Sequence, residues 1–170
     1  AKANADILER ISVSEEHVDK FKEVLLYILN KIGSRPNVGQ AVLYKLLYFI
    51  DFDFYEKYEK HLIGAHYIKN HYGPTPVCFA KIISIMETED SLEKVTSNFF
   101  GKDQTKYLPH KEASLSKFSA EELDHIDKII IRYGNMTAAE LRDFSHKDIP
   151  WIIAEDGKPI DYESVFYRTS

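Results

Sequence analysis

The chain has 170 residues, 44% of them hydrophobic and 13% aromatic, which is enough apolar material for the core of one domain. Its formal net charge of −5, without a run of basic residues, argues against a nucleic-acid-binding surface, because phosphate contacts need clustered Lys and Arg. No apolar run approaches the roughly 20 residues of a membrane helix, and the start of the sequence shows no secretory pattern. Cys78 is the single cysteine, so an intrachain disulfide is excluded, and we expect a cytoplasmic protein.

Residues 1–12 give few packing signals and are interpreted as an N-terminal extension or linker, with residues 13–170 as a single domain. Ser12 and Glu15 have the spacing of a capping box at a helix start. Apolar residues then repeat every three or four positions as far as Ile32, and Gly33 suits the end of a helix. The pattern predicts a first helix that ends at about Ile32.

The stretch at about 38–59 is apolar on both sides of a helical wheel. One face carries Leu43, Leu46, Leu47, Ile50, Phe54 and Tyr58, and the opposite face carries Tyr48, Phe49, Phe52 and Tyr55. Because a helix that is apolar all round is usually buried between layers, we expect this one at the centre of the core, with Asn37 as a candidate N-cap.

Three charged residues of this central helix, Lys45, Asp51 and Asp53, need an explanation, because a lone buried charge is costly. In one interpretation, Lys45 extends its amine to the edge of the core and the two aspartates lie on solvated flanks. In the other, one of the three pairs with a distant residue and fixes how two layers dock.

The middle of the chain changes to a strand pattern. Residues 65–72 alternate between apolar and polar and predict a strand that the Gly-Pro-Thr-Pro sequence at 73–76 ends. Thr75 is then a candidate N-cap, with Pro76 as the first residue of a third helix that runs to about Glu87. Residues 94–100 and 106–112 flank a turn-rich spacer at 101–104, which predicts a β-hairpin that could pair with the 65–72 strand.

The last third is helical. Two capping boxes mark helix starts, at Ser119 with Glu122 and at Thr137 with Glu140. Gly134 ends the first of these helices, Pro150 begins a further one, and Asp161 can cap a short helix near the end. Together the elements predict an α+β fold, mainly α-helical, with a helical core around the buried helix at about 38–59 and a small antiparallel β element.

Candidate chemistry is sparse. His61, His66 and His71 are five residues apart, so the last two would point to opposite faces of a strand, and no metal site is expected. Ser145 and His146 are adjacent on a helix and point about 100° apart, so they form no relay by themselves. No phosphate-binding glycine loop is present, and the sequence implies no cofactor and no catalytic residue.

Surface aromatic residues are the remaining signal. The candidates near expected sheet edges are Tyr67, Tyr72, Phe99, Phe100 and Tyr107. Exposed aromatic side chains on a strand or hairpin are typical of protein-binding surfaces. The alternative is that these rings cover the helical layer.

Three blocks of sequence, taken together, resemble a known family. They are KLLYF at 45–49, YGP at 72–74, and Leu141 with the Ser-His pair at 145–146 that leads to Pro-Trp at 150–151. In this order they resemble the Panacea domain of SocA-type antitoxins, also known as a phage-associated GepA-like domain, over about residues 20–168. Thr75 departs from the Val or Ile expected after the second block, and residues 91–113 match no part of the family pattern, as a partner-specific segment would.

The resemblance implies a mostly helical fold with a small β element and a bacterial or phage antitoxin that neutralises a cognate toxin by direct binding. Some members deliver the toxin to a protease, and the family is not catalytic. The structural motif residues that the resemblance gives are Lys45, Gly73, Pro74, His146, Pro150 and Trp151. We expect Lys45 to pair with a carboxylate or carbonyl near the corner formed by His146 and Trp151.

Two other functions stay open on the sequence. One is an enzyme with a pocket near Lys45, His71 and His146. The other is a transcriptional regulator, against which the acidic charge balance counts.

Overall fold

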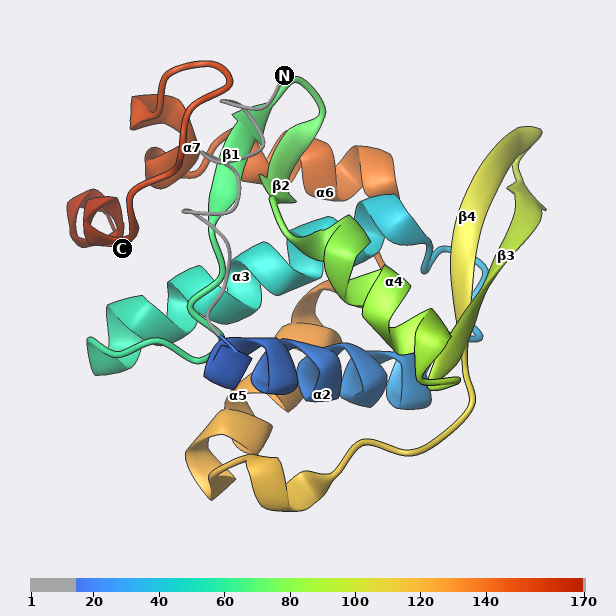
Figure 1. Cartoon of the computed structure of the whole chain (residues 1–170). Helices are drawn as coiled ribbons and strands as arrows, with labels where there is room; N and C mark the ends of the chain where they lie inside the picture. The colour runs from blue at the N-terminus through green and yellow to red at the C-terminus, as the bar shows by residue number, and fades with distance from the viewer. Residues whose placement is uncertain (1–14, 170) are drawn as a thin grey trace, which may run out of the picture.

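The computed structural model describes residues 15–169, and its helices are arranged around the long central helix α3, Gln40–Tyr58 (Figure 1). The fold is mainly α-helical with two small antiparallel sheets in this part of the chain, which confirms the predicted class. The other elements in chain order are α2 (Glu15–Ile32), β1 (Tyr67–Asn70), β2 (Gly73–Pro76), α4 (Phe79–Thr88), β3 (Leu92–Phe99), β4 (Lys102–Pro109), the 3₁₀ helix η1 (Leu115–Lys117), α5 (Ala120–Tyr133), α6 (Ala138–Ser145), α7 (Ile149–Ile153) and the 3₁₀ helix η2 (Tyr162–Tyr167).

Helix α3 is buried on both faces, as predicted, and contacts α5, α6, β2 and η2. Its aromatic residues form the contacts between layers: Phe49 stacks on Tyr133 of α5 at 4.6 Å between ring centroids, and Phe52 stacks on Tyr162 of η2 at 4.2 Å. Stacked aromatic pairs add to the stabilisation from the apolar area that they bury. The central helix therefore joins the elements of the core through both of its sides.

The start of α3 differs from the prediction. Gly39 is the N-cap and no side chain caps the helix there. Asn37 instead donates its side-chain amide to the carbonyls of Gly134 and Met136, both at 2.9 Å. The Asn37 cap is wrong, because this amide joins the start of α3 to the connection between α5 and α6.

Strand β1 is the core of the predicted 65–72 strand, but its partner is β2, the segment that was expected to end the strand. Helix α4 starts only at Phe79, so the predicted start at Thr75 and Pro76 is wrong. The Val77 N–H donates to the His66 carbonyl at 2.9 Å. Since hydrogen-bonded pairs alternate along an antiparallel ladder, Pro76 lies at a non-hydrogen-bonded position, where its missing N–H costs nothing.

The predicted hairpin is formed by β3 and β4. Its turn consists of Phe100 and Gly101, with φ angles of 49° and 80°. The prediction that residues 101–104 form the turn is wrong. Positive φ at both central positions is the signature of a type I′ turn, the turn that best matches the twist of a hairpin. The expected pairing with the 65–72 strand is wrong, because β1–β2 and β3–β4 are separate sheets. The hairpin lies at one edge of the molecule (Figure 1), where β4 contacts α2 and α3 and β3 contacts α4.

The last third follows the sequence closely. Both predicted capping boxes are present, at Ser119 with Glu122 and at Thr137 with Glu140. Gly134 ends α5, Pro150 lies in the first turn of α7, and Asp161 caps η2. The Ser12 cap and the expected 1–12 extension lie outside the described residues.

The segment before η2 runs beside β1 and positions the end of the chain. The N–H groups of Gly157 and Ile160 donate to the carbonyls of Lys69 and Tyr67, both at 2.8 Å. These bonds bring η2 against α3 and α7, where Arg168 reaches the charged residues of the central helix.

Candidate functional site

Asp51 is fully buried, and hydrogen bonds satisfy its carboxylate. Its Oδ1 accepts the N–H groups of Ile63 at 2.8 Å and Gly64 at 3.0 Å. Its Oδ2 accepts the N–H of Ala65 at 3.3 Å and the hydroxyl of Tyr67 at 2.7 Å. Burial raises the pKa of Asp51, and these hydrogen bonds act in the opposite direction by stabilising its anion. Asp51 therefore fixes the path of the chain into β1.

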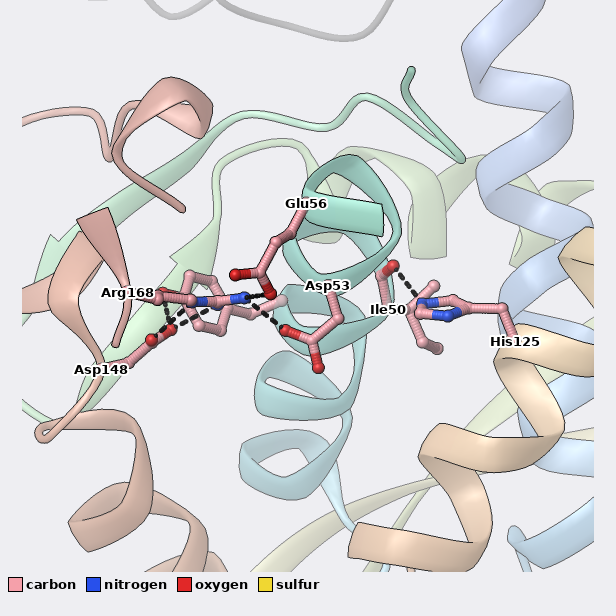
Figure 2. A network of polar contacts seen from close by, with 7 residues as sticks. Ile50, Asp53, Glu56, His125, Asp148 and Arg168 are labelled. Atoms are coloured by element: carbon pink, nitrogen blue, oxygen red, sulfur yellow. Dashed lines mark hydrogen bonds and ion pairs between the residues drawn. The ribbon is translucent and has the colours of Figure 1, made fainter. Parts of the chain in front are cut away.

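A second charged group, which we call the Arg168 cluster, consists of Arg168, Asp148, Asp53 and Glu56, which are labelled in Figure 2, together with Tyr48. The guanidinium of Arg168 binds Asp148 with two nitrogens, Nε to Oδ1 at 2.8 Å and Nη2 to Oδ2 at 2.7 Å. Its Nη1 contacts Asp53 at 2.8 Å and Glu56 at 3.2 Å. The Tyr48 hydroxyl donates to Asp148 Oδ2 at 2.6 Å. The cluster therefore joins α3, the start of α7 and the residue that follows η2.

Burial dominates the electrostatics of this cluster. The side chains of Arg168, Asp148 and Asp53 are only 13%, 11% and 21% exposed. Desolvation raises the pKa of Asp53 to about 6, and although Arg168 acts against this shift, Asp148 and Glu56 add to it. Of the three charges predicted to need an explanation, Asp51 is buried and Asp53 is partly buried. The solvated-flank interpretation is therefore wrong for Asp51, and Asp53 instead pairs with a distant residue, Arg168.

An open cleft of about 430 Å³ lies beside the Arg168 cluster. Aromatic side chains of Phe49, Tyr133 and Phe144 form part of its wall, and Arg132 and Lys147 line it as well. Arg132 lies over the rings of Tyr133 and Phe144 at 5.0 and 5.7 Å from their centroids. The cleft carries charges of both signs, because Asp53, Glu56 and Asp148 also line it.

Lys45, the first motif residue, is buried against Gly73 of β2. A Cβ on Gly73 would lie 3.0 Å from Lys45 Cε and 3.5 Å from Ser145 Oγ, so the glycine allows three elements to approach closely. The Lys45 amine donates to the Ala41 carbonyl of its own helix at 3.1 Å. The expected pairing with the His146 corner is therefore wrong. Burial lowers the pKa of Lys45 to about 8, and the charge of Arg142 adds to this shift.

His146 and Trp151 form the corner that the motif indicates. Their rings stack at 4.5 Å with an interplanar angle of 10°, and Lys69 Nζ lies 5.1 Å from the Trp151 ring centroid. Pro150 and Trp151 are both buried. Burial lowers the pKa of His146, with smaller effects in the same direction from Arg142 and other cations. Of the remaining motif residues, Pro74 is buried in β2 next to Gly73.

The candidate partner-binding aromatics divide into buried and exposed groups. Tyr67 is buried, and its hydroxyl is within hydrogen-bond distance of both the Leu47 carbonyl and the Asp51 carboxylate. Tyr107 is also buried, and its hydroxyl donates a hydrogen bond to Gln40 Oε1 at 2.6 Å. Their expected exposure is wrong, because the two rings cover the helical layer. Tyr72 and Phe100 are exposed, and Phe99 is partly buried.

Ser145, His146 and Asp148, the residues that could suggest a nucleophile and a base, do not form a catalytic relay in the structure. Ser145 Oγ donates to the Arg142 carbonyl at 2.9 Å, and Asp148 is bound to Arg168 and Tyr48. Within residues 15–169, no group of three or more His, Cys, Asp or Glu side chains could hold a metal ion. No helix in this part of the chain is long and apolar enough to cross a membrane.

The fold and the motif together define a class: a mainly helical domain in which Gly73 packs against Lys45 of the buried central helix and against Ser145, and in which the next residue, His146, stacks on Trp151. The model of one family, the antitoxin SocA-like Panacea domain, matches residues 43–152, and the chain belongs to this family. Membership suggests an antitoxin role. Searches of curated proteins and of solved structures gave no match.

Sequence reasoning missed Arg168. It lies beyond the matched segment and is 115 residues from Asp53, so no spacing or periodicity connects the two. The only signal was the presence of aspartates in an otherwise apolar helix, which called for a distant cation without naming it.

Proposed function

We propose that this protein, as a single domain over residues 13–170, is the antitoxin of a toxin–antitoxin system. It neutralises a cognate toxin by direct binding and not by catalysis. Membership of the SocA-like Panacea family supports the antitoxin role, and the tip of the β3–β4 hairpin supports the mode of action.

Phe100 at that tip is the observation that carries the proposal. Its φ is +49°, in the left-handed region where a bulky residue is an outlier and where type I′ turns prefer Asn. This backbone conformation costs about 1–2 kcal/mol. The residue is also 88% exposed, so its side chain adds nothing to the core. A position with two such costs is best explained by a contact with another molecule.

The hairpin also holds Phe100 in place. The Gly101 N–H donates to the Asn98 side chain at 3.0 Å, and the Phe99 ring packs edge-on against Phe100 at 4.6 Å. A ring held on a preorganised turn loses little freedom on binding, and aromatic anchors carry much of the energy of protein interfaces. Phe100 is therefore the proposed anchor, with Phe99 beside it and Tyr72 as a further contact.

The test begins with the products of the neighbouring genes. The protein is co-expressed with each of them, and the expected partner is one that binds stoichiometrically and stops growth when expressed alone. If no neighbouring product is toxic or none binds, the antitoxin proposal is wrong for this protein.

The second step uses Phe100→Asn, which places the preferred residue in the turn. Because a hot-spot residue contributes at least about 2 kcal/mol, binding should weaken by about 30-fold or more, while the melting temperature stays equal or rises. The matched control is Ile131→Asn, which removes an apolar side chain of α5 that is 78% exposed and should leave binding unchanged. Equal neutralisation by wild type and Phe100→Asn would refute the role of the hairpin tip.

A further inference from the structure

Buried charges in this protein are usually well compensated. Asp51 has four hydrogen-bond donors, and Arg168 has three carboxylates. Lys106, a partly buried lysine of β4, donates to the carbonyls of Arg35 at 2.7 Å and Val38 at 3.0 Å. This agrees with the high cost of an unpaired buried polar group.

Lys45 and His146 are the exceptions. Lys45 is 4% exposed, yet within the described residues its amine has one hydrogen bond, to Ala41, and no ion pair. An ammonium group carries three N–H donors, so two lack a partner. The Nε2 atom of His146 is buried and has no hydrogen-bond partner in the same part of the chain.

Two acceptors of α6 are already used. The Arg142 carbonyl at the end of α6 accepts both the Ser145 hydroxyl at 2.9 Å and the His146 backbone N–H at 3.0 Å. Asp143 is mostly exposed and lies 3.5 Å from the guanidinium of Arg142. Neither group therefore serves the amine of Lys45.

The surroundings carry positive charge. Burial is the main cause of the lowered pKa of His146, Arg142, Lys45 and His71 lower it further, and only Asp143 acts against them. The Lys45 amine shares this environment, because Arg142 also acts on its pKa. A concentration of positive charge in a chain of net charge −5 attracts an anion. The N–H groups of Lys45 that lack a partner are donors, and His146 Nε2 is a donor in the tautomer that carries its proton on this atom. The missing group is thus a negatively charged hydrogen-bond acceptor.

We propose that Lys45 and His146 bind an oxyanion, the carboxylate or phosphate group of a ligand, between α3, the β1–β2 turn and the end of α6. Arg142, in the last turn of α6, adds favourable charge. The site lies in the segment that matches the family but does not depend on the toxin contact of the hairpin, so either proposal can fail without the other.

The test measures the melting temperature of the full chain at increasing inorganic phosphate or acetate, with sodium chloride at equal ionic strength as the reference. Both probes report on the oxyanion site. A stronger response to phosphate assigns the site to phosphate groups, and an equal or stronger response to acetate assigns it to carboxylates. The wild type should show a saturable rise with at least one probe, together with a shift of the His146 imidazole NMR signal, assigned by its loss in His146→Gln.

Lys45→Met is the decisive variant. It keeps an unbranched side chain of similar length, removes a poorly compensated buried charge, and should fold. The apparent affinity of Lys45→Met for the probe should be at least tenfold lower than that of the wild type. The matched control is Lys106→Met, which replaces a lysine that has two hydrogen bonds, and its melting temperature should rise with the probe as that of the wild type does. Phosphate also stabilises proteins generally, so an equal response of Lys45→Met and wild type would overturn the proposal. The absence of a saturable response to either probe would overturn it as well, since a water molecule would then satisfy the two groups.

Discussion

Replacement of Arg168 by Met tests whether the Arg168 cluster holds the end of the described chain on the core. Arg168 makes four contacts of 2.7–3.2 Å to Asp148, Asp53 and Glu56. Its removal leaves the carboxylates of Asp53 and Asp148 largely buried without a cation. Breaking a buried pair by removal of one partner costs about 3–5 kcal/mol, and we expect a loss of this size in the free energy of unfolding.

The assay is urea denaturation followed by the fluorescence of Trp151, the one tryptophan of the chain. The control is Lys128→Met, which breaks the exposed pair of Lys128 with Asp124 and should cost less than about 0.5 kcal/mol. A loss below about 1 kcal/mol in Arg168→Met would refute the reasoning, since the cluster would then behave as a surface ion pair.

The pH dependence of the same cluster gives a second readout. Desolvation raises the pKa of Asp53 from 3.8 to about 6 in the folded state, so between pH 7 and pH 5 the folded protein takes up a proton that the unfolded chain does not. Asp53 therefore stabilises the fold more at pH 5 than at pH 7, by about 1 kcal/mol. Asp53→Asn cannot titrate at this position. The free energy of unfolding of the wild type should therefore rise by this amount relative to that of Asp53→Asn when the pH is lowered from 7 to 5. An unchanged difference would show that Asp53 titrates normally.

Three further predictions concern buried polar groups and the motif corner. Asp51→Ala leaves three backbone N–H groups without their acceptor and should cost more than about 3 kcal/mol in urea unfolding, with Asp51→Asn less damaging; equal losses would contradict this. Trp151→Ala should cost about 3–5 kcal/mol by core truncation, measured by circular dichroism because the fluorophore is lost, and an unchanged melting temperature would contradict a structural role. His125 donates Nε2–H to the Ile50 carbonyl at 2.9 Å, on the other side of α3 from the Arg168 cluster (Figure 2), and burial lowers its pKa. The contribution of His125 to stability should therefore fall as pH falls below about 6.5, so the wild type should lose stability relative to His125→Gln over this range, and an unchanged difference would contradict this.

Local signals account for the parts of the fold that the sequence predicted well. The two capping boxes and the two-sided apolar pattern of α3 are local, because the residues that form each pattern lie in the helix itself or directly before it. The sequence therefore predicted these helices with nearly correct bounds. Strand β2 was missed because Gly-Pro-Thr-Pro is typical of a chain break. Its prolines are tolerated only through the register with β1, which pairs Tyr67 with Pro76 and is a property of two segments together.

The candidate sites were predicted less completely, because they depend on tertiary packing. The sequence named Lys45 and His146 but gave Lys45 the wrong partner, and it could not separate buried Tyr107 from exposed Phe100, two aromatics of one hairpin. Arg168 carried no local signal at all, since its role depends on carboxylates 20 and 115 residues away.

The wide separation of Arg168 from Asp53 also sets an order of events during protein synthesis. At about 5–20 residues per second, a ribosome needs roughly 6–23 s to translate the 115 positions between them. Throughout that interval the central helix already carries its aspartates, but their cation does not yet exist. The Arg168 cluster can therefore close only late, after residue 168 has left the ribosome, whereas most of the apolar core around α3 is made of residues that are translated earlier.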